Sequence, residues 1–330
     1  MRMITTCAVL LATFAGIASA EPIKIDEWQV PYEASRPRDP YAVSADEVWF
    51  VGQRAGYLAR LDVTDGSFEK IQLKDGSGPH NLIVQSNGDV WFAGNRTALI
   101  GRYVPRTGEL EEIPMPDPAA RDPHTLIFDT DESHIWFSVQ GGNMLGRLTL
   151  ADRKVELIPS PRERSRPYGI KLAPDGSVWA TLFGSNALVR IDPQSLALEV
   201  IELPREAARP RRLEVLADGS VWYVDYAKGQ LGHYDPESGA FKEWPLPQGD
   251  GARPYGIASD DEGRLWMVAT GVQPNVFLGF DPATESFFSE TDVESGGGTI
   301  RHMHYDAPTG SVWFGADSNT VGRAIVQPDR

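Results

Sequence analysis

The sequence predicts an all-β, seven-bladed β-propeller. Tryptophan recurs along the chain at separations of 42 to 47 residues, and a fixed period of this size is typical of repeat architectures. Each repeat contains four short stretches with strand-like alternation, and no stretch shows a helical period. The tryptophans that set the period are Trp49, Trp91, Trp136, Trp179, Trp222, Trp266 and Trp313.

Residues 1–20 are expected to be a cleaved signal peptide. Arg2 supplies a positive charge, residues 9–17 are mostly apolar, and an Ala-Ser-Ala cleavage signal follows. The apolar stretch is too short to span a bilayer. The single cysteine, Cys7, lies in this segment. The mature chain, residues 21–330, is therefore expected to be one periplasmic or secreted domain without a disulfide.

The repeat around Trp179 shows the strand pattern most clearly. A turn signal, Pro174-Asp175-Gly176, separates its first two predicted strands. The four strands are expected at residues 167–172, 177–181, 188–192 and 198–203. The other repeats follow this pattern, and the sixth carries an insertion near residues 271–275.

The last repeat has no fourth strand of its own, because the chain ends soon after Val326. Residues 25–31 resemble residues 241–247, which form a predicted fourth strand. The N-terminal segment is therefore expected to complete the last blade and close the ring, which removes an open sheet edge. Seven repeats and few channel carboxylates disfavour the alternative of a six-bladed, calcium-dependent lactonase.

The charge distribution restricts the partners. The formal net charge of −15 argues against nucleic acid and anionic membranes, no segment of the mature chain is apolar enough to be transmembrane, and a monomer is expected. The predicted loops before each first strand nevertheless hold thirteen Lys or Arg against nine Asp or Glu. Arginines concentrate at residues 162–166 and 205–212, where they either attract an anionic ligand or pair with neighbouring acidic residues and loop carbonyls.

The candidate site is a ring of polar side chains where the first strands begin, at one mouth of the central channel. Most of these side chains donate hydrogen bonds or titrate, and most follow a proline. Stacking at the mouth is the alternative role, and for any single histidine it is the preferred one. The expected ring is Tyr41, His80, His124, Tyr168, Arg211, Tyr255 and His302, with Arg301 and His304 beside it.

Carboxylates are scarce near this ring. Among the residues three positions after each tryptophan only Asp225 is acidic, and Asp317 lies one position further in the last repeat. This is a poor ligand set for Mg²⁺ or Ca²⁺, which prefer oxygen donors. The histidines suit a transition metal better, but their spacing does not support one.

The chain resembles the virginiamycin B lyase (streptogramin lyase) family over essentially the whole mature sequence. The resemblance rests on Gly78-Pro79-His80-Asn81-Leu82, residues 87–92, Ile100-Gly101-Arg102 and Leu145-Gly146-Arg147. It implies a seven-bladed propeller that opens a cyclic depsipeptide by elimination. A histidine would remove the proton α to the ester carbonyl, and Mg²⁺ held by glutamates would stabilise the enolate-like charge.

Carried onto this sequence, the resemblance makes His302 the base. Arg301 and Arg211 are then expected to bind an oxyanion or carboxylate. The residues expected to shape the substrate pocket are Tyr255, His80, His124, Tyr168 and Tyr41. The family's metal glutamates fall at Ile300 and Ala316, so Mg²⁺ would require Asp317 to replace one of them.

Two functions of different classes remain after the sequence analysis. One is a carbon–oxygen lyase with His302 as base. The other is a non-catalytic propeller whose arginine-rich face binds an anionic glycan, peptide or partner protein. Convergence of His302, Arg301 and Asp317 on one cavity at the mouth would favour the enzyme.

Overall fold

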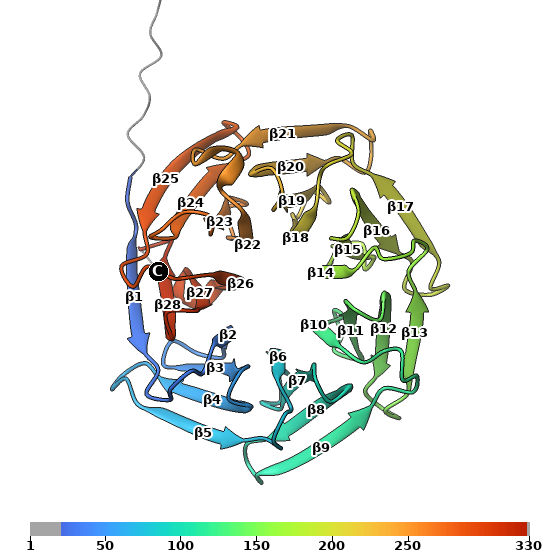
Figure 1. Ribbon diagram of the computed structural model, residues 1–330, viewed down its shortest axis with the longest axis vertical. Helices are drawn as coiled ribbons and strands as arrows, with labels where there is room; N and C mark the ends of the chain where they lie inside the picture. The colour runs from blue at the N-terminus through green and yellow to red at the C-terminus, as the bar shows by residue number, and fades with distance from the viewer. Residues whose placement is uncertain (1–20, 329–330) are drawn as a thin grey trace, which may run out of the picture.

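Within residues 21–328, which the computed structural model describes, seven antiparallel sheets of four strands each surround a central axis (Figure 1). The predicted seven-bladed propeller is confirmed. The expected signal peptide and Cys7 lie outside the described residues. The first strand of each blade lies nearest the axis and the fourth lies at the rim (Figure 1).

The first three blades follow the chain directly. Blade one is β2 (Pro37–Ala42), β3 (Glu47–Gly52), β4 (Tyr57–Asp62) and β5 (Phe68–Gln72). Blade two is β6 (Pro79–Val84), β7 (Val90–Gly94), β8 (Leu99–Val104) and β9 (Glu109–Pro114). Blade three is β10 (Pro123–Phe128), β11 (His134–Val139), β12 (Met144–Thr149) and β13 (Val155–Pro159).

The next three blades repeat the order. Blade four is β14 (Pro167–Leu172), β15 (Val178–Leu182), β16 (Ala187–Ile191) and β17 (Leu198–Glu202). Blade five is β18 (Pro210–Val215), β19 (Val221–Asp225), β20 (Gln230–Tyr234) and β21 (Phe241–Pro245). Blade six is β22 (Pro254–Ser259), β23 (Leu265–Ala269), β24 (Val276–Asp281) and β25 (Ser286–Asp292).

Blade seven combines the two ends of the chain. It consists of β26 (Ile300–Asp306), β27 (Ser311–Ala316), β28 (Thr320–Ile325) and the N-terminal strand β1 (Lys24–Gln29). Two 3₁₀ turns, η1 (Gly249–Gly251) and η2 (Ala307–Thr309), are the only helical elements among residues 21–328, and neither is long enough to cross a membrane.

The tryptophans pack between blades, as large aromatic side chains do in a core that must join repeated sheets. Trp136 of blade three lies in one apolar cluster with Ile170 and Val178 of blade four. Trp222 of blade five packs in the same way with Ile257 and Leu278 of blade six. The period in the sequence is therefore the period of the inter-blade contact.

The ring closes through β1, as predicted. Trp28 pairs in register with Val321 of β28, and its ring stacks on Trp313 at a centroid distance of 5.5 Å. The Arg323 guanidinium lies over the Trp28 ring at 5.3 Å and donates to Asp26 at 2.8 Å. Just before β1, the Ile23 amide donates to Thr291 Oγ1 at 2.9 Å. The N-terminal segment thus joins blades six and seven.

We expect Trp28→Ala to lower the free energy of unfolding by about 2–3 kcal/mol, because it removes the stacked ring that closes the propeller. Urea unfolding measures this loss. Lys24→Ala is the matched control, since Lys24 is exposed on the same strand. Equal losses in the two variants would show that closure does not depend on this ring.

Candidate functional site at the mouth of the channel

Strand pairing defines which side chains ring the mouth. Each first strand opens with a residue that pairs with the end of the second strand, as Pro79 does with Gly94. The side chain after this opening residue lies at the mouth. These seven residues, here called the mouth ring, are Arg38, His80, His124, Tyr168, Arg211, Tyr255 and Arg301.

In two blades the residue expected in the ring is not the one at the mouth-ring position. Tyr41 pairs with Trp49, so it lies three residues beyond Arg38, further along the channel. In the last blade Trp313 pairs with His304, nine residues earlier, whereas Trp91 pairs with Ile83, eight residues earlier. His80 lies eleven residues before Trp91. Counting the same eleven residues back from Trp313 reaches His302, whereas the mouth-ring position is occupied by Arg301, one residue earlier.

The histidines and tyrosines of the mouth ring stack across the channel. The His80 and His124 ring centroids lie 3.6 Å apart, and those of His124 and Tyr168 lie 4.1 Å apart. The hydroxyl groups of Tyr168 and Tyr255 are hydrogen-bonded to each other. All four side chains are buried. The four side chains therefore form one contiguous buried cluster at the mouth.

His80 is held as a neutral imidazole. Arg38 Nη1 donates to His80 Nε2 at 2.6 Å, which fixes the ring proton on Nδ1 because a guanidinium only donates. Burial, followed by the charge of Arg38, lowers the pKa of His80 well below its ordinary value. Burial and the charge of Arg212 do the same to the pKa of His124.

Arg211 lies in a cage of aromatic rings. Its guanidinium carbon is 3.7 Å from the ring centroid of Tyr255, 4.3 Å from that of Tyr226 and 4.4 Å from that of Phe183. Arg211 Nη2 also donates to the Tyr255 hydroxyl at 2.8 Å. Ring faces attract a cation without cancelling its charge, so Arg211 brings a fixed positive charge to the mouth.

Arg38 of the mouth ring and its neighbour Arg212 are buried, with one carboxylate between them. Arg38 and Arg212 are each 4% exposed. Arg38 Nε lies 3.4 Å from Asp39 Oδ1, and Arg212 Nη2 lies 3.9 Å from Asp39 Oδ2. Arg38 Nε, Arg38 Nη2 and Arg212 Nη2 make no hydrogen bond within the described part of the chain. Buried donors are normally satisfied, so these three nitrogens lack acceptors, although Arg38 Nη1 and Arg212 Nε each have one.

Tyr168 responds to this positive charge. Burial opposes ionisation of its phenol, but the charges of Arg211, Arg38 and Arg212 outweigh burial and lower its pKa to about 8. Its neighbour Tyr255 has its pKa raised to about 12 by burial and by Tyr168. The hydrogen-bonded pair therefore holds one proton more loosely than an ordinary phenol does.

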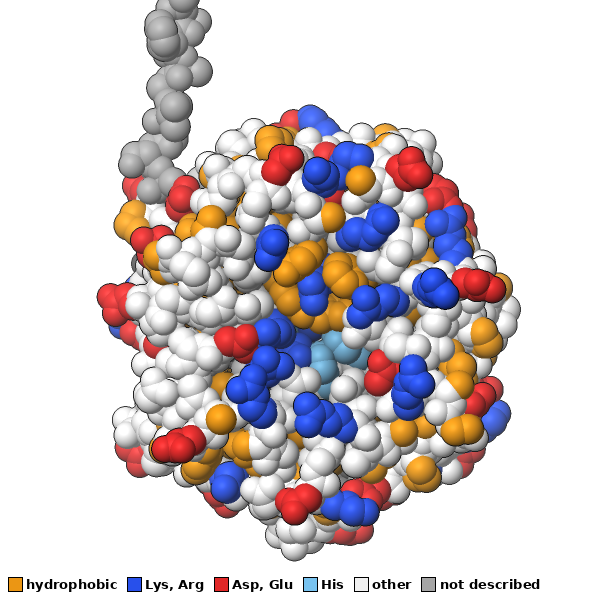
Figure 2. All heavy atoms as spheres, in the orientation of Figure 1, with side chains coloured by type: hydrophobic (Ala, Val, Ile, Leu, Met, Phe, Trp, Pro, Cys, Tyr) orange, Lys and Arg blue, Asp and Glu red, His pale blue; other side chains and the backbone are white. Residues whose placement is uncertain are grey.

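The wider face is basic around a central hollow (Figure 2). The arginines between 162 and 212 do not form one open groove, because most have partners of their own. Arg162 pairs with Glu202. Arg205 Nη2 contacts Asp225 at 2.6 Å and Glu243 at 2.8 Å. Among the described residues Arg211 of the mouth ring has no carboxylate partner, and neither do Arg164, Arg166 and Arg209.

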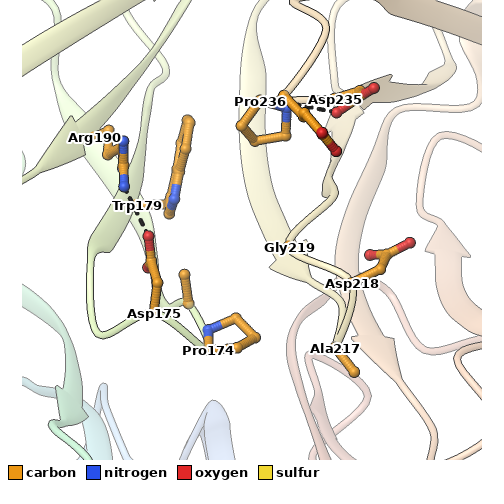
Figure 3. Close-up of a pocket in the computed structure, with 11 residues that line it drawn as sticks. Pro174, Asp175, Trp179, Arg190, Ala217, Asp218, Gly219, Asp235 and Pro236 are labelled. Carbon is orange, nitrogen blue, oxygen red and sulfur yellow. Dashed lines mark hydrogen bonds and ion pairs between the residues drawn. The ribbon is translucent and has the colours of Figure 1, made fainter.

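A surface cleft of about 430 Å³ lies elsewhere, between blades four and five (Figure 3). It is reached from the turn that ends β14, which is the opposite end of the first strand from the mouth. Arg190 Nη2 bonds Asp175 Oδ2 at 2.7 Å on one wall, and Asp218 and Asp235 stand on the other. These acidic groups are not grouped closely enough to hold a metal ion.

The Virginiamycin B lyase family model matches residues 23–324. The chain belongs to the virginiamycin B lyase family. The comparison with curated proteins finds no match.

Solved structures of this family share the fold. Selenomethionine-substituted virginiamycin B lyase from Staphylococcus aureus is 24% identical, with 92% of this chain and 99% of that chain covered and a TM-score of 0.81. A streptogramin B lyase structure is 25% identical, with 92% and 97% covered and a TM-score of 0.81. A catalytically inactive histidine-to-alanine variant of the S. aureus enzyme with quinupristin is 24% identical, with 92% and 99% covered and a TM-score of 0.82.

The metal site implied by the family resemblance does not fit the residues present. Ile300 and Ala316, at the expected glutamate positions, are 0% and 1% exposed and carry no ligand atoms. Asp317 is already engaged, since both terminal nitrogens of Arg301 bond it and Arg36 Nε lies 3.5 Å away. Within residues 21–328 no group of three or more His, Asp or Glu is arranged to hold a metal. Mg²⁺ therefore has no built site here.

His302 belongs to another part of the channel. It lines a cavity of about 310 Å³, the lower chamber, together with Tyr41, Lys171 and His304. The lower chamber also includes Glu132 from the connection after β10, so it opens at the far end from the mouth. Burial, followed by the charges of Arg212 and Lys171, lowers the pKa of His302 well below its ordinary value. His302 is thus a neutral imidazole that does not share a cavity with Arg301 and Asp317.

The sequence also contains a repeated Arg-Pro pair beside the mouth, which the expected ring did not include. Arg-Pro precedes the mouth-ring residue in four blades, at Arg36, Arg166, Arg209 and Arg253. Three of these arginines have left-handed backbone, with φ of 52° at Arg36, 53° at Arg166 and 46° at Arg253. Residues other than glycine seldom adopt positive φ, so the backbone at these three arginines has an uncommon conformation.

We expect Tyr168 to ionise near pH 8, as its lowered pKa requires. Phenolate absorbance in the near ultraviolet, followed against pH, should show one early tyrosine that Tyr168→Phe removes. Arg211→Gln should raise the pKa of Tyr168 by about one unit or more, because a nearby cation is lost. Absence of any tyrosine ionising before the bulk would contradict this description of the mouth.

Proposed function

We propose that this member of the virginiamycin B lyase family binds an anionic ligand at the channel mouth. The observation that carries the proposal is the pair of buried arginines, Arg38 and Arg212, which share only Asp39 and keep guanidinium N–H groups without acceptors. Isolated charge is expensive to bury unless it is paired. A bound anion supplies both the missing charge and the missing acceptors.

The surroundings support a ligand that is more than a simple ion. Arg211 is partly exposed and has no carboxylate partner among the described residues, so it offers further donors. Phe183 and Tyr226 are also partly exposed and flank Arg211. Planar guanidinium groups match carboxylates in bidentate geometry. We therefore favour a carboxylate attached to an apolar or carbohydrate body.

Export is part of the proposal. Residues 1–20 carry the charge, apolar stretch and cleavage signal of a secretory leader. The ligand would then be met in the periplasm or outside the cell, where anionic glycans and peptides are available.

Citrate is a suitable probe, because it offers several carboxylates to the mouth. Calorimetric titration at low salt should show saturable binding that weakens as salt is added. Arg211→Gln and Arg38→Gln should each weaken binding roughly tenfold, the cost of one charge-assisted hydrogen bond. Arg60→Gln is the control, because Arg60 pairs with Glu47 and Glu69 away from the mouth. Equal affinity in all three variants would refute the proposal.

Elimination with His302 as base is the second candidate. His302 Nδ1 is buried without a hydrogen-bond partner, and the imidazole is neutral, as a general base must be. The candidate is weaker because His302 does not line a cavity with Arg301 and Asp317, and because no metal-ligating group of side chains is found among residues 21–328. Any elimination in this chain would have to take place in the lower chamber.

We expect no Mg²⁺-dependent opening of the quinupristin lactone, because the residues that would hold the metal are absent. Mass spectrometry follows the intact and opened ring with added Mg²⁺ and with a chelator. The S. aureus virginiamycin B lyase serves as the positive control. Mg²⁺-dependent turnover that His302→Ala abolishes would overturn this expectation and restore the lyase as the leading function.

A further inference from the structure

The lower chamber differs from the mouth in charge. Lys171 Nζ lies 2.8 Å from Glu214 Oε1, and Glu214 is buried. Glu132 accepts from the Ser86 amide at 3.1 Å, and Asp129 bonds His134 Nδ1 at 2.7 Å. Lys171 is therefore neutralised by Glu214, whereas the carboxylate of Glu132 is bonded only by the neutral Ser86. The chamber holds no positive charge that an anion must neutralise.

The two histidines of the lower chamber are uncharged as well. Burial and the charge of Lys171 lower the pKa of His304 to about 3. The pKa of His302 is lowered in the same direction, first by burial. An anion would be repelled by the Glu132 carboxylate here, and any ion would lose its hydration.

The walls suit a flat, apolar molecule. The Tyr41 and His304 rings stack at a centroid distance of 4.2 Å with planes 19° apart and present a planar surface. Leu126, Ile127 and Ile170 supply aliphatic walls. The volume of about 310 Å³ lies at the small end of the range for small-molecule pockets.

One polar group in the lower chamber is unsatisfied. His302 Nδ1 is buried and makes no hydrogen bond within the described chain. A neutral imidazole carries one donor nitrogen and one acceptor nitrogen, and buried polar atoms are normally paired. A ligand with one hydrogen-bonding group would supply the partner that His302 Nδ1 lacks.

We propose that the lower chamber is a second binding site, independent of the mouth, for a small uncharged molecule with a planar ring and one hydrogen-bonding group directed at His302. His80, His124 and Tyr168 do not line the lower chamber, which contains residues from the other end of the first strands. The mouth favours negative charge, whereas the lower chamber favours an uncharged molecule.

N-phenyl-1-naphthylamine tests this proposal, since it is uncharged, planar, carries one N–H group and fluoresces in apolar surroundings. Titration into the mature chain should give a saturable fluorescence increase with one site. Ile127→Trp fills the chamber and should weaken binding roughly tenfold or more. Leu110→Trp is the matched control, because Leu110 is 41% exposed on β9 and adds an indole to the outer surface.

Ile127→Phe, a smaller change, is the second variant should Ile127→Trp fold poorly, and circular dichroism checks both. The imidazole NMR signal that His302→Gln removes should shift when the probe binds. Non-saturable fluorescence would overturn the proposal. So would saturable binding that Ile127→Trp and Ile127→Phe leave as tight as Leu110→Trp does. Neither result depends on whether citrate binds the mouth.

Discussion

Closure of the ring through β1 is the constraint on which the rest of the structure depends. Pairing of Trp28 with Val321 completes the seventh blade, so seven first strands must share one narrow axis. Each layer of the channel then receives one side chain from every blade. The chemistry of the protein follows from which residues share a layer, and not from any local motif.

The layers of this channel separate two kinds of surroundings. At the mouth, Arg38 and Arg212 both form ion pairs with the buried Asp39, Arg211 has no carboxylate partner among the described residues, and Asp317 is engaged by Arg301 and Arg36. Beyond the stacked rings, Lys171 is matched by Glu214 and the histidines are neutral. Positive charge therefore concentrates at one end of the channel of an acidic protein, where it can attract and hold an anion.

The family relationship explains the fold better than it explains the chemistry. A propeller needs the inter-blade tryptophans and the closing strand, and both are present. A Mg²⁺-dependent elimination needs carboxylates near the base, but Ile300 and Ala316 are buried and apolar. The Asp317 carboxylate instead accepts hydrogen bonds from Arg301. Arginine charge thus stands where the resemblance implied a metal.

The sequence predicted the blades because the tryptophan period reports the inter-blade contact that every repeat must make. It placed His80, His124, Tyr168, Arg211 and Tyr255 at the openings of their strands, where the register locates them. It misplaced Tyr41, which lies eight residues before Trp49, whereas the mouth-ring residue Arg38 lies eleven before it. It misplaced His302 because the first hairpin of blade seven is one residue longer than that of blade two. A single sequence does not reveal such shifts, and a shift of one residue decides which part of the channel a side chain meets.

The most direct test of the central claim is the pKa of Tyr168 with and without citrate. Its lowered pKa of about 8 reports the uncompensated arginine charge at the mouth. If an anion binds there, citrate neutralises that charge and should raise the pKa by about one unit, and sodium chloride of equal ionic strength should raise it less. An unchanged pKa at saturating citrate would contradict the account.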